Sequence, residues 1–120
     1  MEINPSRSIP TLVIEDPSKP PVTITQSLSA LEYLDEMPGG SAHPLLPPMS
    51  DTEGRATVRT LANIIVSDIH PVTNLRIRNK VDALGADPKA WCRGLTEDGL
   101  RAYEKVVSKT AGSFSVGDHI

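Results

Sequence analysis

Two places in the first quarter of the chain carry residue types suited to holding an anionic, peptide-like ligand. Ile9 and Pro10 precede an apolar run at residues 11–15, and a cis bond before the proline would turn the N–H and C=O of Ile9 toward a ligand. Gln26 and Ser27 open a helical pattern, where unpaired backbone N–H groups and a hydroxyl attract a carboxylate. A ligand with a peptide-like middle and a carboxylate end fits both places.

Each place also has a simpler interpretation. Proline has no backbone donor and often stands at the first residue of a strand, so Pro10 could mark only a strand boundary. Ser27 could be only part of a helix cap, which is the usual role of serine at that position. The two interpretations of the helix start are compatible, because an N-terminus without a side-chain cap keeps its donors for an anion.

The remaining reactive residue types form no metal or nucleophile pattern. The histidines, His43, His70 and His119, lack the spacing of metal ligands, and we expect no bound metal. Cys92 has no histidine within a helical turn, so we expect a structural, unreactive cysteine. His70 precedes Pro71, a pairing more typical of a kinked helix with a surface or cleft histidine than of a ligand contact.

A β-hairpin followed by a helix must position the first two places. Apolar patterning predicts strands at residues 11–15 and 22–25, joined by the turn sequence DPSKPP. The period then changes and predicts a helix at residues 26–37, with its apolar residues on one side. The apolar residues of that side are Leu28, Leu31, Tyr33, Leu34 and Met37.

The second half of the chain predicts helices separated by recognisable breaks. Ser50 and Glu53 have the spacing of a capping box, and helical periodicity continues from there to Leu75. Pro71 should kink this helix, because proline removes a backbone hydrogen bond. After the break ALGADP, Asp87 is expected to cap a helix that starts at Pro88 and continues to residue 110.

Composition narrows the class of protein. A chain of 120 residues is large enough for a folded core. Its 12 basic and 15 acidic residues give a net charge of -3 without a basic block, which argues against a nucleic-acid partner. No apolar run is long enough to span a membrane, and the N-terminus lacks a secretory signal pattern. A single cysteine excludes a disulfide framework, and a soluble, reducing, cytoplasmic setting is expected.

Several sequence strings, in this order, resemble the zeta class of glutathione transferases, the maleylacetoacetate isomerases. The strings are NPSRSIPTLVIED, ITQSLSALEYLDE, LLP, RATVR, HPVTNL and VGD. The resemblance implies an α/β (α+β) fold. An incomplete thioredoxin-like domain, a β-hairpin plus a helix, would occupy residues 1–37, followed by a linker at 38–50. The first helices of an all-α glutathione-transferase domain would occupy residues 51–120.

The resemblance also implies roles for individual residues, with glutathione as cofactor. Pro10 would be a cis-proline, and the backbone of Ile9 would pair with the cysteinyl part of glutathione. Gln26 and Ser27 would hold the γ-glutamyl carboxylate and amine.

In the helical part, the resemblance places His70 and Asn74 beside glutathione. Leu75 and Arg76 would line the cleft for a small dicarboxylate substrate. The simpler interpretation is that Arg76 and Arg78 both lie on a solvated face. Of the two, Arg76 is favoured for the substrate contact because it lies nearer to Asn74 in the sequence.

The resemblance leaves two hypotheses for function. The family isomerises maleylacetoacetate to fumarylacetoacetate in tyrosine and phenylalanine breakdown, typically as a homodimer. Its thiol-activating serine lies in a loop that has no counterpart in this sequence, so no catalytic residue is assigned. The first hypothesis is a glutathione-dependent isomerase or transferase that is complete only with an N-terminal segment. The second is a truncated, non-catalytic binding or dimerisation protein.

Overall fold

The computed structural model describes residues 3–39 and 42–118 and divides into two compact units, Met1–Leu45 and Leu46–Ile120. The boundary between the units lies inside the linker predicted at residues 38–50. Residues 40 and 41 of that linker, and His119, lie outside the described residues. The assignment of separate domains to residues 1–37 and 51–120 stays a prediction.

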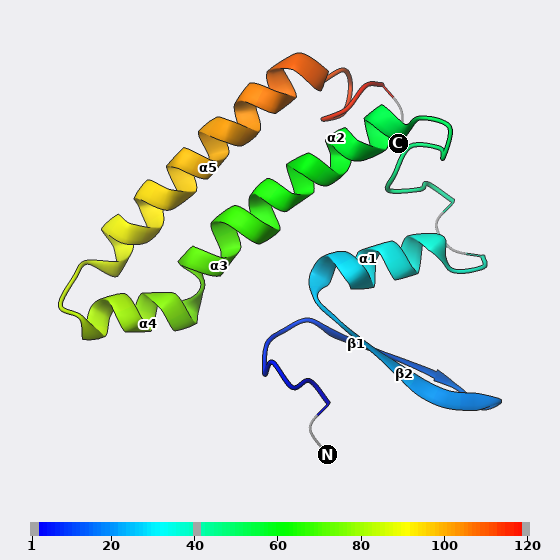
Figure 1. Cartoon of the computed structure of the whole chain (residues 1–120), viewed down its shortest axis with the longest axis horizontal. Helices are drawn as coiled ribbons and strands as arrows, with labels where there is room; N and C mark the ends of the chain where they lie inside the picture. Colours follow the sequence, from blue (N-terminus) through cyan, green and yellow to red (C-terminus); the bar gives the residue numbers. More distant parts are fainter. Residues whose placement is uncertain (1–2, 40–41, 119–120) are drawn as a thin grey trace. The chain divides into compact units, whose positions relative to one another are not determined.

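The first unit is a hairpin followed by one helix. Strands β1 (Thr11–Asp16) and β2 (Lys19–Thr25) pair in antiparallel register, and α1 (Ser27–Glu36) follows directly and contacts both strands (Figure 1). Leu12 lies opposite Ile24, so successive pairs of apolar side chains share one face of the hairpin. The predicted hairpin and helix are confirmed.

The turn of the hairpin is tighter than the sequence suggested. Asp16 pairs with Lys19, which leaves only Pro17 and Ser18 between the strands. The carboxylate of Asp16 accepts hydrogen bonds from the Ser18 hydroxyl at 2.7 Å and the Ser18 N–H at 2.9 Å. These two bonds, with a smaller contribution from Lys19, lower the pKa of Asp16. The predicted start of the second strand at residue 22 was wrong, because the Asp16 turn closes the ladder earlier.

Two prolines lie inside β2, which explains why the sequence hid the start of this strand. Pro20 and Pro21 cannot donate to a ladder, but β2 is one of only two strands in its sheet, and edge strands tolerate proline. The register also shifts between Ile14 and Asp16, and such an irregularity leaves a residue unpaired.

The hairpin covers only part of the apolar side predicted for α1. Ala30 is buried, at 8% exposure, whereas Leu31, Leu34 and Met37 are 47%, 45% and 39% exposed. The face of α1 that carries Ala30 is therefore the one that packs inside this unit.

The regular elements described in the second unit are helices, apart from an isolated bridge between Ala111 and Gly117. The unit contains α2 (Thr52–Asn63), the π-helix η1 (Ile64–Ile69), α3 (His70–Thr73), α4 (Leu75–Ala83) and α5 (Pro88–Thr110). Figure 1 shows α5 returning alongside the succession α2 to α3, with α4 in the connection. The buried residues of this unit are Leu46, Leu61, Ile69 and Val81.

The long helix predicted up to Leu75 was wrong in its second half. The chain passes through the π-helix η1, forms the short α3, and turns at Asn74, whose backbone is extended (φ -68°, ψ 166°). Pro71 falls in the first turn of α3, where its missing N–H costs little. Leu75 starts the separate helix α4 and is 67% exposed, so it does not continue the buried stripe.

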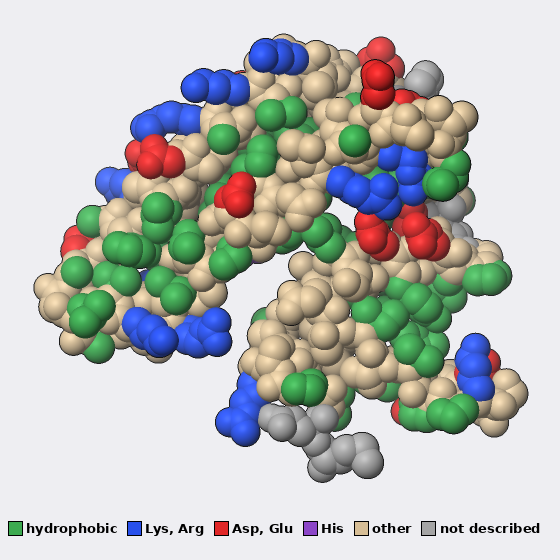
Figure 2. Space-filling view, viewed as in Figure 1, with side chains coloured by type: hydrophobic (Ala, Val, Ile, Leu, Met, Phe, Trp, Pro, Cys, Tyr) green, Lys and Arg blue, Asp and Glu red, His purple; other side chains and the backbone are tan. Residues whose placement is uncertain are grey.

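The predicted cap of α5 is confirmed. Asp87 accepts hydrogen bonds from the N–H groups of Lys89 at 2.8 Å and Ala90 at 3.3 Å, and Pro88 is the first helical residue. Gly85 has φ +77° in the preceding turn, a conformation that ends helices and favours glycine. Figure 2 shows Lys and Arg side chains following α5 along the edge of the molecule, with acidic side chains among them. No helix within the described ranges is long and apolar enough to cross a membrane.

The cap of α2 differs from the predicted capping box. The first N–H groups are served by Asp51, whose side chain accepts from Gly54 N–H at 2.8 Å, and not by Ser50. Gly54 makes room for this cap, since a Cβ there would overlap the carboxylate of Asp51. The helix therefore starts one residue later than the Ser50 box implies.

Asp51→Ala is expected to lower the free energy of unfolding by about 1 kcal/mol, because it removes the N-cap. Ser50→Ala is the matched control and should change the stability by less than about 0.5 kcal/mol. Urea denaturation of the two variants and the wild type measures both values. Equal losses for the two variants would contradict the cap at Asp51.

Candidate functional site

The bond between Ile9 and Pro10 lies in a loop that is held largely by the side chain of Asn4, with a further hydrogen bond of 2.7 Å between the hydroxyls of Ser6 and Ser8. The Nδ2 of Asn4 donates to the carbonyl of Ser8 at 2.6 Å and to Oγ1 of Thr11 at 3.1 Å. Its Oδ1 accepts from the N–H and the hydroxyl of Ser6, at 3.0 and 2.8 Å. The peptide bond from Ile9 to Pro10 is cis, and the side chain of Ile9 is 96% exposed.

The hairpin register brings this loop to the start of α1. Thr11 pairs with Thr25 at the end of the ladder. Pro10 comes just before Thr11 and Gln26 comes just after Thr25, so both lie at the same end of the hairpin. The two places selected from the sequence are thereby neighbours within the first unit.

The start of α1 lacks a side-chain cap. Gln26 occupies the N-cap position but makes no capping hydrogen bond, although the carbonyl of Gln26 accepts from Ala30 N–H at 3.1 Å. The first N–H groups of a helix have no partner inside the helix, so those of α1 remain donors for an external acceptor. Gln26 is exposed and Ser27 is half-buried.

The backbone of Gln26 supports a role beyond capping. Its dihedrals are φ 75° and ψ 131°, a region that residues with a side chain rarely occupy and that costs about 1–3 kcal/mol. Such conformations cluster at binding sites, because the surrounding structure must hold them in place. Here the hairpin ladder on one side and α1 on the other fix the residue.

The remaining predicted site residues lie in the second unit, around the break between α3 and α4. His70, Leu75 and Arg76 are exposed, and neither His70 nor Arg76 has a side-chain hydrogen bond or ion pair to another described residue. His70 lies at the start of α3, whereas Leu75 and Arg76 lie in the first turn of α4. The break thus displays all three side chains to solvent.

Asn74 joins the two helices with its side chain. Its Nδ2 donates to the carbonyl of Pro71 at 3.1 Å, and its Oδ1 accepts from Ile77 N–H at 3.1 Å. It therefore closes α3 and opens α4 at once. One amide hydrogen and one acceptor position remain for a ligand, so the predicted contact with glutathione is compatible with this structural role and stays a prediction.

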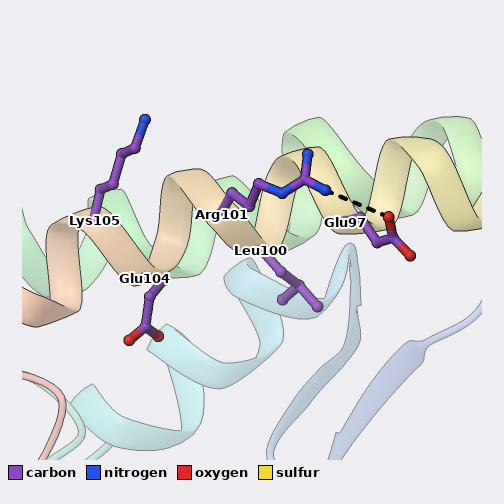
Figure 3. A pocket seen from close by; sticks show the side chains of 5 residues that line it. All are labelled: Glu97, Leu100, Arg101, Glu104 and Lys105. Atoms are coloured by element: carbon purple, nitrogen blue, oxygen red, sulfur yellow. Dashed lines mark ion pairs between the residues drawn. The ribbon is translucent and has the colours of Figure 1, made fainter.

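A shallow depression on α5 is lined by none of the predicted site residues. Figure 3 shows the side chains that line it, with the ion pair between Arg101 and Glu97 at 3.5 Å. The lining residues are Glu97, Leu100, Arg101, Glu104 and Lys105. Within the described part of the chain, no group of histidine, cysteine and carboxylate side chains could hold a metal ion.

Two features of the site have only a weak signal in the sequence. Asn4 organises the loop before Pro10 through four hydrogen bonds of its side chain. The Asn-Pro pair at residues 4 and 5 is a known turn signal and could have drawn attention to it. The hinge at Asn74 was hidden, because periodicity continues smoothly through it.

Comparison with known proteins finds similar sequences and similar solved structures. No protein-family model matches the chain. A maleylacetoacetate isomerase of Aspergillus fumigatus is 58% identical over 118 residues, which are 98% of this chain and 51% of that protein. The maleylacetoacetate isomerase of Rattus norvegicus is 36% identical, again over 98% of this chain and 50% of the relative. The chain therefore spans about half the length of the curated relatives it matches.

Solved structures give the same result. A maleylacetoacetate isomerase from Anaeromyxobacter dehalogenans, crystallised with glutathione in its active site, superposes with a TM-score of 0.83 at 34% identity. That match covers 96% of this chain and 51% of the other chain. A maleylpyruvate isomerase, a bacterial glutathione transferase of the zeta class, superposes with a TM-score of 0.79 at 34% identity, over 97% of this chain and 53% of the other. By sequence and by fold, the chain resembles about half of a zeta-class glutathione transferase, the class of the maleylacetoacetate isomerases, and it has a partial thioredoxin-like fold followed by helices.

Proposed function

We propose that the protein carrying these residues is a glutathione-dependent isomerase that converts maleylacetoacetate to fumarylacetoacetate. The observation that carries this proposal is the end of the hairpin, where the Ile9–Pro10 loop meets the uncapped start of α1. This arrangement offers a backbone edge and a set of N–H donors side by side. Glutathione has a peptide backbone and a free γ-glutamyl carboxylate, which match the two features.

Each residue of the first unit has a role in this proposal. The N-terminal N–H groups of α1 and the Ser27 hydroxyl bind the γ-glutamyl carboxylate, because the helix dipole favours an anion there. The side-chain amide of Gln26 faces the same group from the N-cap position and contacts the amine. The backbone of Ile9, held by Asn4 and followed by Pro10, pairs with the cysteinyl part.

The second unit supplies the substrate side in this proposal. Arg76 is exposed in the first turn of α4, and its guanidinium suits a carboxylate of a dicarboxylate substrate. Leu75 provides an apolar contact next to it, and His70 and Asn74 contact glutathione. Bound glutathione would supply the thiolate that adds to the double bond and leaves after rotation. The residues of this chain bind and orient the two molecules, and we assign the activation of the thiol to none of them.

The finer partner and location assignments belong to the same proposal. We propose a homodimer in the cytoplasm, on the grounds of the family resemblance. Light scattering of the full-length protein tests the dimer, and fractionation of the source cells tests the location.

The proposal is tested by an isomerase assay on the full-length protein with maleylacetoacetate and glutathione. The wild type should turn over the substrate. Arg76→Ala should raise the KM for maleylacetoacetate about tenfold, since a charge-assisted hydrogen bond is worth about 1.5–3 kcal/mol.

Arg78→Ala is the matched control, because it removes another exposed arginine of the same helix. It should leave KM within about twofold of the wild type. Glutathione binding without turnover would favour a non-catalytic binding protein instead, and equal effects of the two variants would remove Arg76 from the site.

A further inference from the structure

The carbonyl groups at the end of α3 receive an unusual set of partners. The last carbonyls of a helix receive no hydrogen bond from within the helix, so they need other donors. At the end of α3, three consecutive carbonyls each accept from a side chain. Pro71 accepts from Asn74 Nδ2 at 3.1 Å, Val72 from Trp91 Nε1 at 2.9 Å, and Thr73 from Cys92 Sγ at 3.5 Å.

Two of these donors come from α5, far away in the sequence. Trp91 is 47% exposed, so burial of its ring is only partial and its indole N–H is the group that ties it to Val72. Cys92 is half-buried, and its thiol, a weak donor, lies next along the same helix. Two adjacent side chains near the start of α5 thus donate to the last carbonyls of α3.

The next residue after these carbonyls determines where α4 points. Asn74 is extended, and its carbonyl and side chain receive the N–H groups of Ile77 and Arg78, which start α4. Rotation of the Val72 and Thr73 peptide groups would turn Asn74 and the first turn of α4 with them. The bonds from Trp91 and Cys92 oppose that rotation.

We propose that Trp91 and Cys92 are positioning residues, which set the direction in which α4, with Leu75 and Arg76, leaves the end of α3. This inference rests on the proposed function, since Leu75 and Arg76 are the residues assigned there to the dicarboxylate substrate. Neither Trp91 nor Cys92 needs to touch the substrate. They act through the carbonyls of Val72 and Thr73.

The test uses the full-length protein and its variant Trp91→Phe, which keeps an aromatic ring but removes the indole donor. Hydrogen exchange at the amides of Ile77 and Arg78 should become roughly fivefold faster, because their acceptor Asn74 is less fixed. The KM for maleylacetoacetate should rise roughly fivefold to tenfold, the equivalent of one hydrogen bond, with kcat nearly unchanged.

Three further variants separate positioning from loss of stability. Trp91→Phe combined with Cys92→Ala should raise KM beyond the single variant, whereas Cys92→Ser keeps a donor and should leave KM at the wild-type value. Val107→Ala is the control for stability, because Val107 lies in the same helix but away from the residues that contact α3. It should lower the melting temperature without raising KM.

The outcomes distinguish the two proposals. Unchanged exchange, unchanged KM in Trp91→Phe, or an equal rise of KM in Val107→Ala would each overturn the positioning role. An inactive wild type overturns the proposed function and with it the substrate part of this inference. Unchanged exchange with an active wild type overturns the positioning role alone.

Discussion

Gly99→Ala is expected to destabilise the second unit by about 1–2 kcal/mol, although alanine is the better helix former. A Cβ at residue 99 would lie 2.6 Å from Cδ1 of Ile69 and would also overlap its Cγ1. Ile69 is 6% exposed and belongs to the π-helix η1, so its side chain has little room to move. Overpacking of this kind costs about 1–3 kcal/mol or more, which exceeds the gain in helix propensity of about 1 kcal/mol.

Gly94→Ala is the matched control for this prediction. Gly94 lies in the same helix, α5, and a Cβ there would meet nothing within 4 Å. The helix propensity then acts alone and should stabilise the protein by about 0.5–1 kcal/mol. The two substitutions are chemically identical, so opposite signs can come only from the contact with Ile69.

Urea denaturation of both variants measures the difference, and a double-mutant cycle locates it. Ile69→Ala alone should be destabilising by about 2–5 kcal/mol, because it leaves a cavity in the core. Combined with Gly99→Ala, it should cost less than the sum of the two singles, since the new methyl group enters the vacated space. Equal stability of the Gly94 and Gly99 variants would show that α5 does not pack on η1 at this point.

The double variant Gln26→Ala with Ser27→Ala is expected to weaken glutathione binding by the full-length protein about a hundredfold or more. Each side chain would lose a hydrogen bond to a charged group, worth about 1.5–3 kcal/mol. Alanine has the same difficulty as glutamine at the positive φ of residue 26. The substitution therefore removes side-chain contacts without relaxing the backbone.

Isothermal titration with glutathione measures this loss, and Ser29→Ala serves as its control. Ser29 lies in the first turn of α1 and is exposed, and its hydroxyl has no role in the proposed site. The dissociation constant of the Ser29→Ala variant for glutathione should stay within about twofold of the wild-type value. A double variant that binds glutathione as well as the wild type would rule out the start of α1 as the binding site.

The candidate site shows how far local sequence signals carry. Ile9, Pro10, Gln26 and Ser27 were selected from their types and positions, and the alternation of the strands placed them at one end of a hairpin. Antiparallel pairing fixes this outcome, because the residues before the first strand and after the second strand must meet. The local sequence is therefore enough to predict that these residues lie near one another, and no contact with a distant segment is needed.

The caps show where local signals compete. Asp87 and Pro88 were predicted correctly, because they are the only cap-forming pair at that break. At the start of α2, Ser50 and Asp51 are both good N-caps and stand next to each other. Gly54, which admits the Asp51 side chain, decides between them, and this choice depends on backbone geometry.

Other features were decided by the tertiary structure. Periodicity runs through residues 58–75 without interruption, so it cannot distinguish one kinked helix from the sequence of η1, α3 and α4. The chain turns at Asn74, and the carbonyls freed by that turn are satisfied by Trp91 and Cys92 from another helix. The donors lie on another helix, 19 residues along the chain from their acceptors, so the break has no local signature in the sequence. The local pattern was therefore sufficient for the hairpin, for α1 and for the start of α5, whereas the packing of α5 against η1 and α3 decided where the long helix ends.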